Sequence, residues 1–286
     1  MKVLGRYNYA SGYGESSVVA HGYDDLGERV VIKNMGKGKE VHKQILKEFE
    51  IMVNCKHENV LDVIDMGLDK DGNYYMVFEH TNGNVLEYLQ MDLSKAGKES
   101  ELGSRFFTRE EKIKEIMRQL LLGLAWLHER GVAHQGMTKD NVLVKVKGCD
   151  FKVKLGDFSC ARRLCNNPPE TTLKVGTAVD IWSAGILLVG MILPLEMPEL
   201  PEKEAKGEVL ETIKKFLRAL DDLIKDKDAL ELVKSMLASD PVTARQALAF
   251  RNAEDMSGIV KRAPPLQGLD MIKEAQGEYA ACSTGN

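Results

Sequence analysis

The sequence predicts an α+β fold of two lobes, a small antiparallel sheet with one helix followed by a larger, mainly helical part. Two observations predict it. Residues 1–80 contain short runs rich in β-branched and aromatic side chains, separated by glycine-containing turns. From residue 82 onward, apolar residues recur at the spacing of amphipathic helices. The chain has 286 residues, which is enough for one large domain or two small ones.

The first lobe is expected to contain strands and one helix, in an order that the residues indicate. Glycines interrupt the first hairpin, and an Asp-Gly-Asn turn joins the last two strands. The helix is predicted from apolar residues at helical spacing. The expected elements are a hairpin over residues 7–20, a strand over 28–33, a helix over 41–52, and strands over 60–66 and 74–79.

The second lobe is expected to be built around two long helices. One begins after Thr108, which forms a capping box with Glu111. The other, over residues 180–193, is apolar on nearly every side and is therefore predicted to be central. A polar insertion is expected over residues 93–107, amphipathic helices over 209–224 and 229–238, and a polar tail after residue 250.

Composition excludes several classes of protein. The apolar share of 44% and the charged share of 29% are ordinary for a globular protein. A net charge of −4 indicates neither a nucleic acid nor a membrane as partner. The five cysteines lack metal-ligand spacing, which predicts free thiols. Because no apolar leader begins the chain, we expect a cytoplasmic protein, with the nucleus left open.

Two polar loops flank a predicted strand pair in the middle of the chain. Asn141 closes the first loop, and Asp157 begins the second after an alternation of Phe151, Val153 and Leu155. Amide and carboxylate oxygens are ligands that Mg²⁺ accepts beside phosphates. Asn and Asp are also common turn residues, so this pair alone is weak evidence for a metal site.

Further motifs, in the order in which they follow along the chain, make the prediction of a metal site beside phosphates more specific. Residues 12–19 resemble the glycine-rich loop of the protein kinase family, and residues 27–33 resemble its strand that ends in lysine. Residues 75–79 look like the strand that leads to the connection between its lobes, and residues 178–185 are similar to its central-helix signature. Together these segments resemble that family over about residues 5–250, which implies its bilobal fold.

The resemblance implies a site for ATP and Mg²⁺. In the family, glycine amides approach the phosphates, a lysine holds them, a helix glutamate fixes that lysine, and Asn and Asp carry the metal. The metal positions correspond to Asn141 and Asp157. The expected nucleotide-binding residues are Gly12, Gly14, Val19, Val31, Lys33, Glu48, Phe78, Glu79 and Leu143.

The first polar loop departs from the family at the residues that perform the transfer. Residues 134–141 fit the family's catalytic loop without a gap, yet Gly136 stands where the catalytic aspartate is expected. Glycine has no side chain and cannot act as a base, a loss that typically costs about 10²–10⁴-fold in rate. Thr138 stands where a lysine would touch the γ-phosphate. Asp140 is the candidate substitute for the base.

Further departures affect the nucleotide cradle and the substrate side. Val31 replaces an alanine against which adenine would pack, and Ser159 replaces a glycine. Pro168-Pro169-Glu170 resembles the motif that ends the activation segment, although only residues 158–167 separate it from Asp157. The chain thus divides into a kinase-like first lobe (1–80), a second lobe with a shortened activation segment (81–250) and a polar tail (251–286).

These observations favour a pseudokinase, a kinase homologue that binds ATP but lacks the catalytic aspartate and acts as a regulatory or scaffold module with a protein partner. An active Ser/Thr-type kinase with a rearranged catalytic loop is the first alternative. The second is a structural interaction module without nucleotide, in which Val31 and Ser159 block the pocket.

Overall fold

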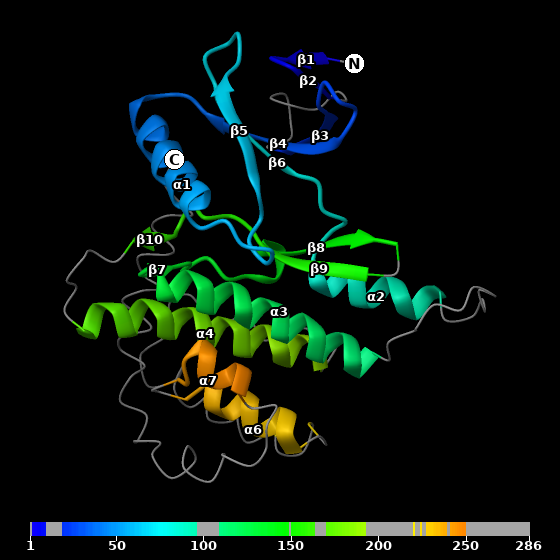
Figure 1. Cartoon of the computed structure of the whole chain (residues 1–286), viewed down its shortest axis with the longest axis vertical. Helices are drawn as coiled ribbons and strands as arrows, with labels where there is room; N and C mark the ends of the chain where they lie inside the picture. Colours follow the sequence, from blue (N-terminus) through cyan, green and yellow to red (C-terminus); the bar gives the residue numbers. More distant parts are fainter. Residues whose placement is uncertain are drawn as a thin grey trace, which may run out of the picture.

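The computed structural model describes residues 2–9, 19–95, 109–148, 150–163, 170–192, 220, 224, 227–238 and 241–249. Figure 1 shows two lobes, a sheet with one helix above and a group of helices below. This arrangement confirms the predicted fold class. Several predicted features lie outside the described residues, namely Gly12 and Gly14, the cap Thr108, residues 96–107, most of 209–224 and the tail 251–286.

The upper lobe contains one antiparallel sheet with the strand order β1-β2-β3-β4-β6-β5. The strands run where the sequence predicts strands, apart from the additional β1 at the N-terminus. Their bounds are β1 Lys2–Leu4, β2 Tyr7–Tyr9, β3 Val19–Tyr23, β4 Arg29–Gly36, β5 Val63–Leu68 and β6 Tyr74–Glu79.

Alternation along β4 gives the sheet two different faces. Val30 and Ile32 are buried in a small apolar cluster on one face. Because successive side chains of a strand point to opposite faces, Val31 and Lys33 lie on the other face. That face is turned toward α1 (Lys39–Asn54), whose Ile45 belongs to the main core cluster. The sequence pattern of this strand therefore fixes where Lys33 points.

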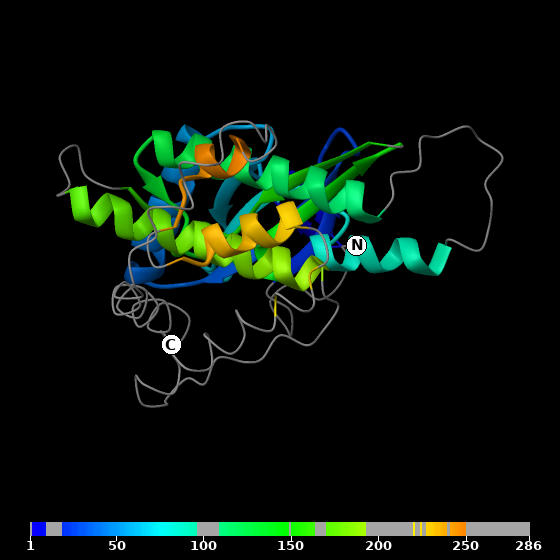
Figure 2. The ribbon, with the colours of Figure 1, turned by 90° about the horizontal axis from the view of Figure 1, so that it is seen from below.

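The lower lobe is built on two long helices that pack against each other, α3 (Arg109–Glu129) and α4 (Glu170–Ile192). Figures 1 and 2 show α6 (Lys227–Met236) and α7 (Ala244–Ala249) below them and α2 (Val85–Lys95) to one side. Within the described residues, no helix combines the length and hydropathy needed to cross a membrane.

The helix α4 begins at Glu170, ten residues before the predicted start at Asp180. It starts directly after Pro169, and the next proline is Pro194. Proline is tolerated just before or in the first turn of a helix, and no breaker follows it here, so the helix continues unbroken. The prediction from the apolar run alone was therefore too short.

Short strands join the two lobes. The hairpin of β8 (Val142–Lys147) and β9 (Asp150–Leu155) lies between the sheet and the helices (Figure 1). The strand β7 (Val132–Ala133) pairs with β10 (Arg162–Arg163), and η1 (Lys139–Asn141) is a single 3-10 turn. The first polar loop, residues 134–141, and the second polar loop, residues 156–159, thus lie at the same end of these paired strands, because Ala133 pairs with Arg162 and Val142 pairs with Leu155.

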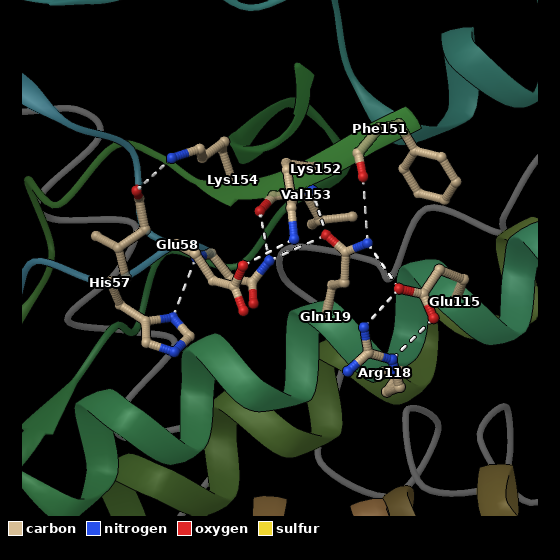
Figure 3. A network of polar contacts seen from close by, with 11 residues as sticks. His57, Glu58, Glu115, Arg118, Gln119, Phe151, Lys152, Val153 and Lys154 are labelled. Atoms are coloured by element: carbon tan, nitrogen blue, oxygen red, sulfur yellow. Dashed lines mark hydrogen bonds and ion pairs between the residues drawn. The ribbon is translucent and has the colours of Figure 1, made fainter. Parts of the chain in front are cut away.

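A buried glutamine holds the hairpin against α3. The side-chain oxygen of Gln119 accepts hydrogen bonds from Asn59 Nδ2 (3.0 Å) and from the Val153 amide (2.8 Å). Its nitrogen donates to Glu115 (2.8 Å) and to the Phe151 carbonyl (3.3 Å). Figure 3 shows Gln119 reaching from the helix to β9. Side chains therefore satisfy backbone groups that a neighbouring strand would otherwise bind.

We expect Gln119→Leu to lower the free energy of unfolding by about 3 kcal/mol, because it removes hydrogen bonds from buried groups of Asn59, Phe151 and Val153. Denaturant unfolding measures this change. Glu110→Leu, at an exposed position of the same helix, is the control and should change stability by less than about 0.5 kcal/mol. Equal stability of wild type and Gln119→Leu would contradict this account.

Candidate functional site

A buried carboxylate on α4 fixes the backbone of the first polar loop. Asp180 is fully buried and accepts hydrogen bonds from the amides of His134 (2.8 Å) and Gln135 (2.7 Å). His128 Nε2 lies 2.9 Å from the same carboxylate. Gln135 has a φ of 55°, a backbone conformation that residues other than glycine rarely adopt. The hydrogen bond to Asp180 offsets that strain.

A neutral histidine joins the two polar loops. The Gly136 amide donates to His134 Nδ1 (3.2 Å), so Nε2 carries the proton and donates to the Gly156 carbonyl (3.0 Å). Burial lowers the pKa of His134 below its ordinary value, which is consistent with the neutral form. Its ring also contacts the buried ring of Phe158, with 4.6 Å between centroids.

The two expected metal ligands lie on adjacent segments. The Gly156 amide donates to the Asn141 carbonyl (2.8 Å), and Asp157 follows immediately with a φ of 56°. Asn141 Nδ2 donates to the Gly136 carbonyl (2.7 Å). Neither Asn141 Oδ1 nor Asp157 Oδ2 accepts a hydrogen bond from any other described residue. Two oxygen donors are thus available to Mg²⁺, whose remaining ligands would be phosphate oxygens and water.

The cation beside this pair is Lys33. Its Nζ lies 3.4 Å from Asp157 Oδ1. Burial acts to raise the pKa of Asp157, but Lys33 and the Ser159 amide outweigh it, and the pKa is lowered. Asp157 is therefore ionised at neutral pH, as a metal ligand requires.

The expected ion pair between Lys33 and Glu48 is not formed. Among the described residues Lys33 pairs only with Asp157, and no contact within 4.0 Å joins it to Glu48. Glu48 is 3% exposed, and its Oε1 has no hydrogen-bond partner there. Burial raises the pKa of Glu48, although Lys33 and the Phe158 amide partly oppose the shift. Asp157 and Glu48 thus compete for one lysine, and Asp157 holds it here.

Apolar side chains of the predicted nucleotide site line one face of the sheet. Val19 lies opposite Lys33, and Val31 lies opposite Phe78, so all four share the face that carries the lysine. Val31 and Leu143 are both partly buried against the main core cluster. These residues come together as the resemblance implies, whereas Gly12 and Gly14 lie outside the part that the structure describes.

The side chain of Glu79 is used within the protein. Its carboxylate pairs with Lys145 (2.6 Å) and Lys154 (2.7 Å), and it accepts the Asp62 amide (2.9 Å). Only the backbone of Glu79 therefore remains for a ligand. The sequence did not identify Lys154 as a buried residue, because the alternation of apolar residues along β9 predicts it on the polar face. In the structure Lys154 is 7% exposed. The acidic residue Glu79 at the end of β6 was the one indication in the sequence that this lysine has a buried partner.

The position at which the resemblance implies a catalytic base is sterically open. Gly136 is buried, and a Cβ there would lie 3.5 Å from the Asp157 carbonyl and from the His134 ring, which are ordinary contact distances. The candidate substitute Asp140 lies on η1 with a side chain 66% exposed, 3.6 Å from Lys139. Asp140 is therefore directed to solvent and does not occupy the place of the base.

We expect Glu48→Gln to stabilise the protein at neutral pH. The raised pKa means that the folded state favours protonated Glu48. Below pH 4.5, the ordinary pKa, the ionisation of Glu48 should therefore cause no difference in stability between wild type and Glu48→Gln. As pH rises through the folded pKa, ionisation costs the wild type stability and the advantage of Glu48→Gln grows. Melting temperatures between pH 4.5 and 8 test this. Glu50→Gln, at an exposed position of α1, should show no such trend, and a flat difference for Glu48→Gln would contradict the prediction.

Comparison with known proteins agrees with this geometry. The model of the protein kinase domain matches residues 8–250. The serine/threonine-protein kinase STE20 of Candida glabrata is 30% identical over 309 aligned residues, which cover 96% of this chain and 30% of that protein. The probable serine/threonine-protein kinase fhkA of Dictyostelium discoideum is 27% identical, with 83% of this chain and 47% of that protein covered.

A probable myosin light chain kinase of Dictyostelium discoideum is 28% identical, and the alignment covers 79% of this chain and 70% of that protein. The chain spans less than half of the length of the first two relatives. Because the kinase-domain model extends over most of the chain and the fold agrees with it, this protein belongs to the protein kinase family.

Proposed function

We propose that this protein is a pseudokinase, which binds ATP with Mg²⁺ and acts by regulating a protein partner rather than by transferring phosphate. The observation that carries the proposal is the absence of a side chain at Gly136, close to the other described residues of the expected site. Lys33 lies 3.4 Å from Asp157, and Asn141 binds the Gly136 carbonyl, which supports binding of a nucleotide and its metal at this place. Binding and transfer thus depend on different residues, and those for transfer are missing.

Each retained group has a role in binding. Lys33 supplies positive charge for phosphate oxygens, and Asn141 and Asp157 supply oxygen ligands for the metal. Bound Mg²⁺ would neutralise negative charge between phosphates. Since Mg²⁺ at Asp157 would weaken the attraction of that carboxylate for Lys33, the lysine could approach the phosphates and Glu48 Oε1, which has no hydrogen-bond partner. Nucleotide binding would therefore also relieve the buried charge of Glu48.

Two absences argue against efficient transfer. No side chain at Gly136 can take the proton of a substrate hydroxyl, and loss of a general base costs about 10²–10⁴-fold. Thr138 cannot supply the positive charge near the γ-phosphate that a lysine would provide. Asp140, the residue that an active kinase with a rearranged loop would need, is exposed beside Lys139. The active alternative therefore has the weaker support.

The first prediction is nucleotide binding. ATP or ADP at about 100 times its dissociation constant should raise stability by about 2.7 kcal/mol, which is visible as several degrees in a thermal unfolding scan. The shift should grow with Mg²⁺ and disappear in Lys33→Met. Lys37→Met, an exposed lysine just after β4, is the matched control and should keep the shift. No shift at millimolar nucleotide would favour the alternative of a structural module without nucleotide.

The second prediction concerns transfer. Wild-type protein should give no detectable phosphorylation of itself or of a generic protein substrate. Gly136→Asp combined with Thr138→Lys should raise transfer by at least about 10²-fold, because the Cβ at residue 136 fits and both missing groups return. Adding Lys33→Met to that variant should abolish the gained activity. Wild-type transfer that Lys33→Met abolishes would overturn the proposal.

A further inference from the structure

We propose that a phosphate group on a phosphorylated segment of a protein partner binds where the ends of α1 and α3 meet, at the side chains of His57, Trp126, Arg130 and Arg163. These four residues are called the anion site below. The inference rests on the proposed function in one respect, since it assigns the phosphate to a protein partner. It does not require bound nucleotide and can be tested separately.

The indole N–H of Trp126 is a buried donor without an acceptor. Trp126 lies in the last turn of α3, and its side chain is partly exposed, but its Nε1 is buried and has no hydrogen-bond partner. The other buried side-chain atoms without a partner in the described part of the chain are oxygens of Glu48 and Asn59. A buried tryptophan N–H usually has a partner, because an unpaired donor is costly. This donor therefore marks a place where a ligand can supply an acceptor.

The ring of His57 supplies a second donor beside the indole. Its Nδ1 accepts a hydrogen bond from the Asn59 amide (3.1 Å), so Nε2 carries the proton in the neutral ring. No described residue accepts a hydrogen bond from that Nε2. The ring stacks on Trp126 with 5.1 Å between centroids and 29° between planes, and Figure 3 shows it turned toward α3. Two N–H donors thus lie side by side without an acceptor.

An exposed arginine covers the indole. Arg130 Cζ lies 3.1 Å from the centroid of the Trp126 ring, and Arg130 Nη1 donates to the Trp126 carbonyl at 3.3 Å. No carboxylate of a described residue lies within 4.0 Å of this guanidinium. Contacts of an exposed cation with a ring are weak, as is a hydrogen bond of this length. An anion can therefore draw Arg130 off the ring and reach the indole N–H beneath it.

Arg163 on β10 brings a second guanidinium to the end of α1. Burial raises the pKa of the Cys55 thiol, whereas Arg163 and Arg130 both act to lower it, so both charges act on the same buried group. Arg163 Nη1 lies 3.8 Å from Glu50, and the two side chains are 50% and 67% exposed. An ion pair this long and this exposed contributes little, so Arg163 can exchange Glu50 for a ligand.

Other carboxylates near the anion site are bound to cations outside it. Glu58, whose charge acts on His57, pairs with Lys152 at 2.7 Å. Glu129, on which Arg130 acts, pairs with Arg245 at 2.5 Å. Within the described part of the chain, the anion site therefore keeps an excess of positive charge and of hydrogen-bond donors.

The number and kind of donors favour phosphate over carboxylate. Two guanidinium groups, an imidazole N–H and an indole N–H offer more donors than the two oxygens of one carboxylate can use. A phosphorylated side chain carries nearly two negative charges and three strong acceptor oxygens. Arginine clusters bind such groups through paired, charge-assisted hydrogen bonds. The chemistry of the anion site thus fits a phosphorylated segment.

The test follows the indole N–H signals of the whole chain by nuclear magnetic resonance. The chain has two tryptophans, Trp126 and Trp182, and Trp126→Phe identifies the signal of residue 126. The probes are capped tripeptides with glycine on both sides of phosphoserine, glutamate or serine, titrated at constant ionic strength. We expect the phosphoserine peptide to move the Trp126 signal with a dissociation constant of about 1 mM, as a few charge-assisted hydrogen bonds would give. The glutamate peptide should bind more weakly, and the serine peptide should leave the signal unchanged.

Charge variants separate the anion site from general attraction to a basic surface. Arg130→Gln and Arg163→Gln should each weaken binding of the phosphoserine peptide about tenfold, and both positions are exposed, so the variants should fold. Lys114→Gln removes the same charge from an exposed position of α3 and should leave the affinity unchanged. A Trp126 signal that the phosphoserine peptide does not move, or an equal loss of affinity in Lys114→Gln, would overturn the anion site. Equal affinity for the glutamate peptide would overturn the assignment to phosphate.

The two proposals fail in different ways. Lys33→Met should keep the response of the Trp126 signal to the phosphoserine peptide, and loss of that response would mean that the peptide acts through the nucleotide site, which overturns the anion site. If wild-type protein binds nucleotide and its Trp126 signal does not move, the anion site fails and the proposed function stands. If wild-type protein binds no nucleotide and the signal moves, nucleotide binding fails and the anion site stands.

Discussion

The geometry of the candidate site depends on the buried carboxylate of Asp180. It sits in the middle of the longest helix described, and it binds the backbone of the first polar loop at two consecutive amides. With these fixed, His134 can bridge to Gly156, and Asn141 can bind the Gly136 carbonyl. The buried helix thus fixes the backbone of the first polar loop through polar contacts.

These contacts explain how the first polar loop keeps its geometry with glycine at residue 136. The loop is held through main-chain groups and through His134 and Asn141, and none of the interactions requires a particular side chain at residue 136. Glycine there removes a chemical group but no structural contact. The geometry of this loop therefore does not depend on the side chain at residue 136.

Much of the fold was predictable, because alternation along β4 and helical spacing along α1 are local patterns that tertiary contacts reinforce. The site residues were placed by order and spacing, and the structure brings Lys33, Asn141 and Asp157 together. The partner of Lys33 could not be predicted, since Glu48 and Asp157 are both within its reach. The burial of Lys154 was equally hidden, because it depends on Glu79, which lies far away in sequence.

Both edges of the hairpin of β8 and β9 are covered by other parts of the chain. Gln119 and Asn59 occupy backbone groups along the outer side of β9, and Asn82 and Gly83 occupy backbone groups of Val144 and Val146 in β8. A two-stranded sheet usually presents unpaired groups on both sides, which can recruit a strand from another chain. Here neither side is open to such pairing. Self-association through this hairpin, and the aggregation that begins in that way, would first require these covering groups to be displaced.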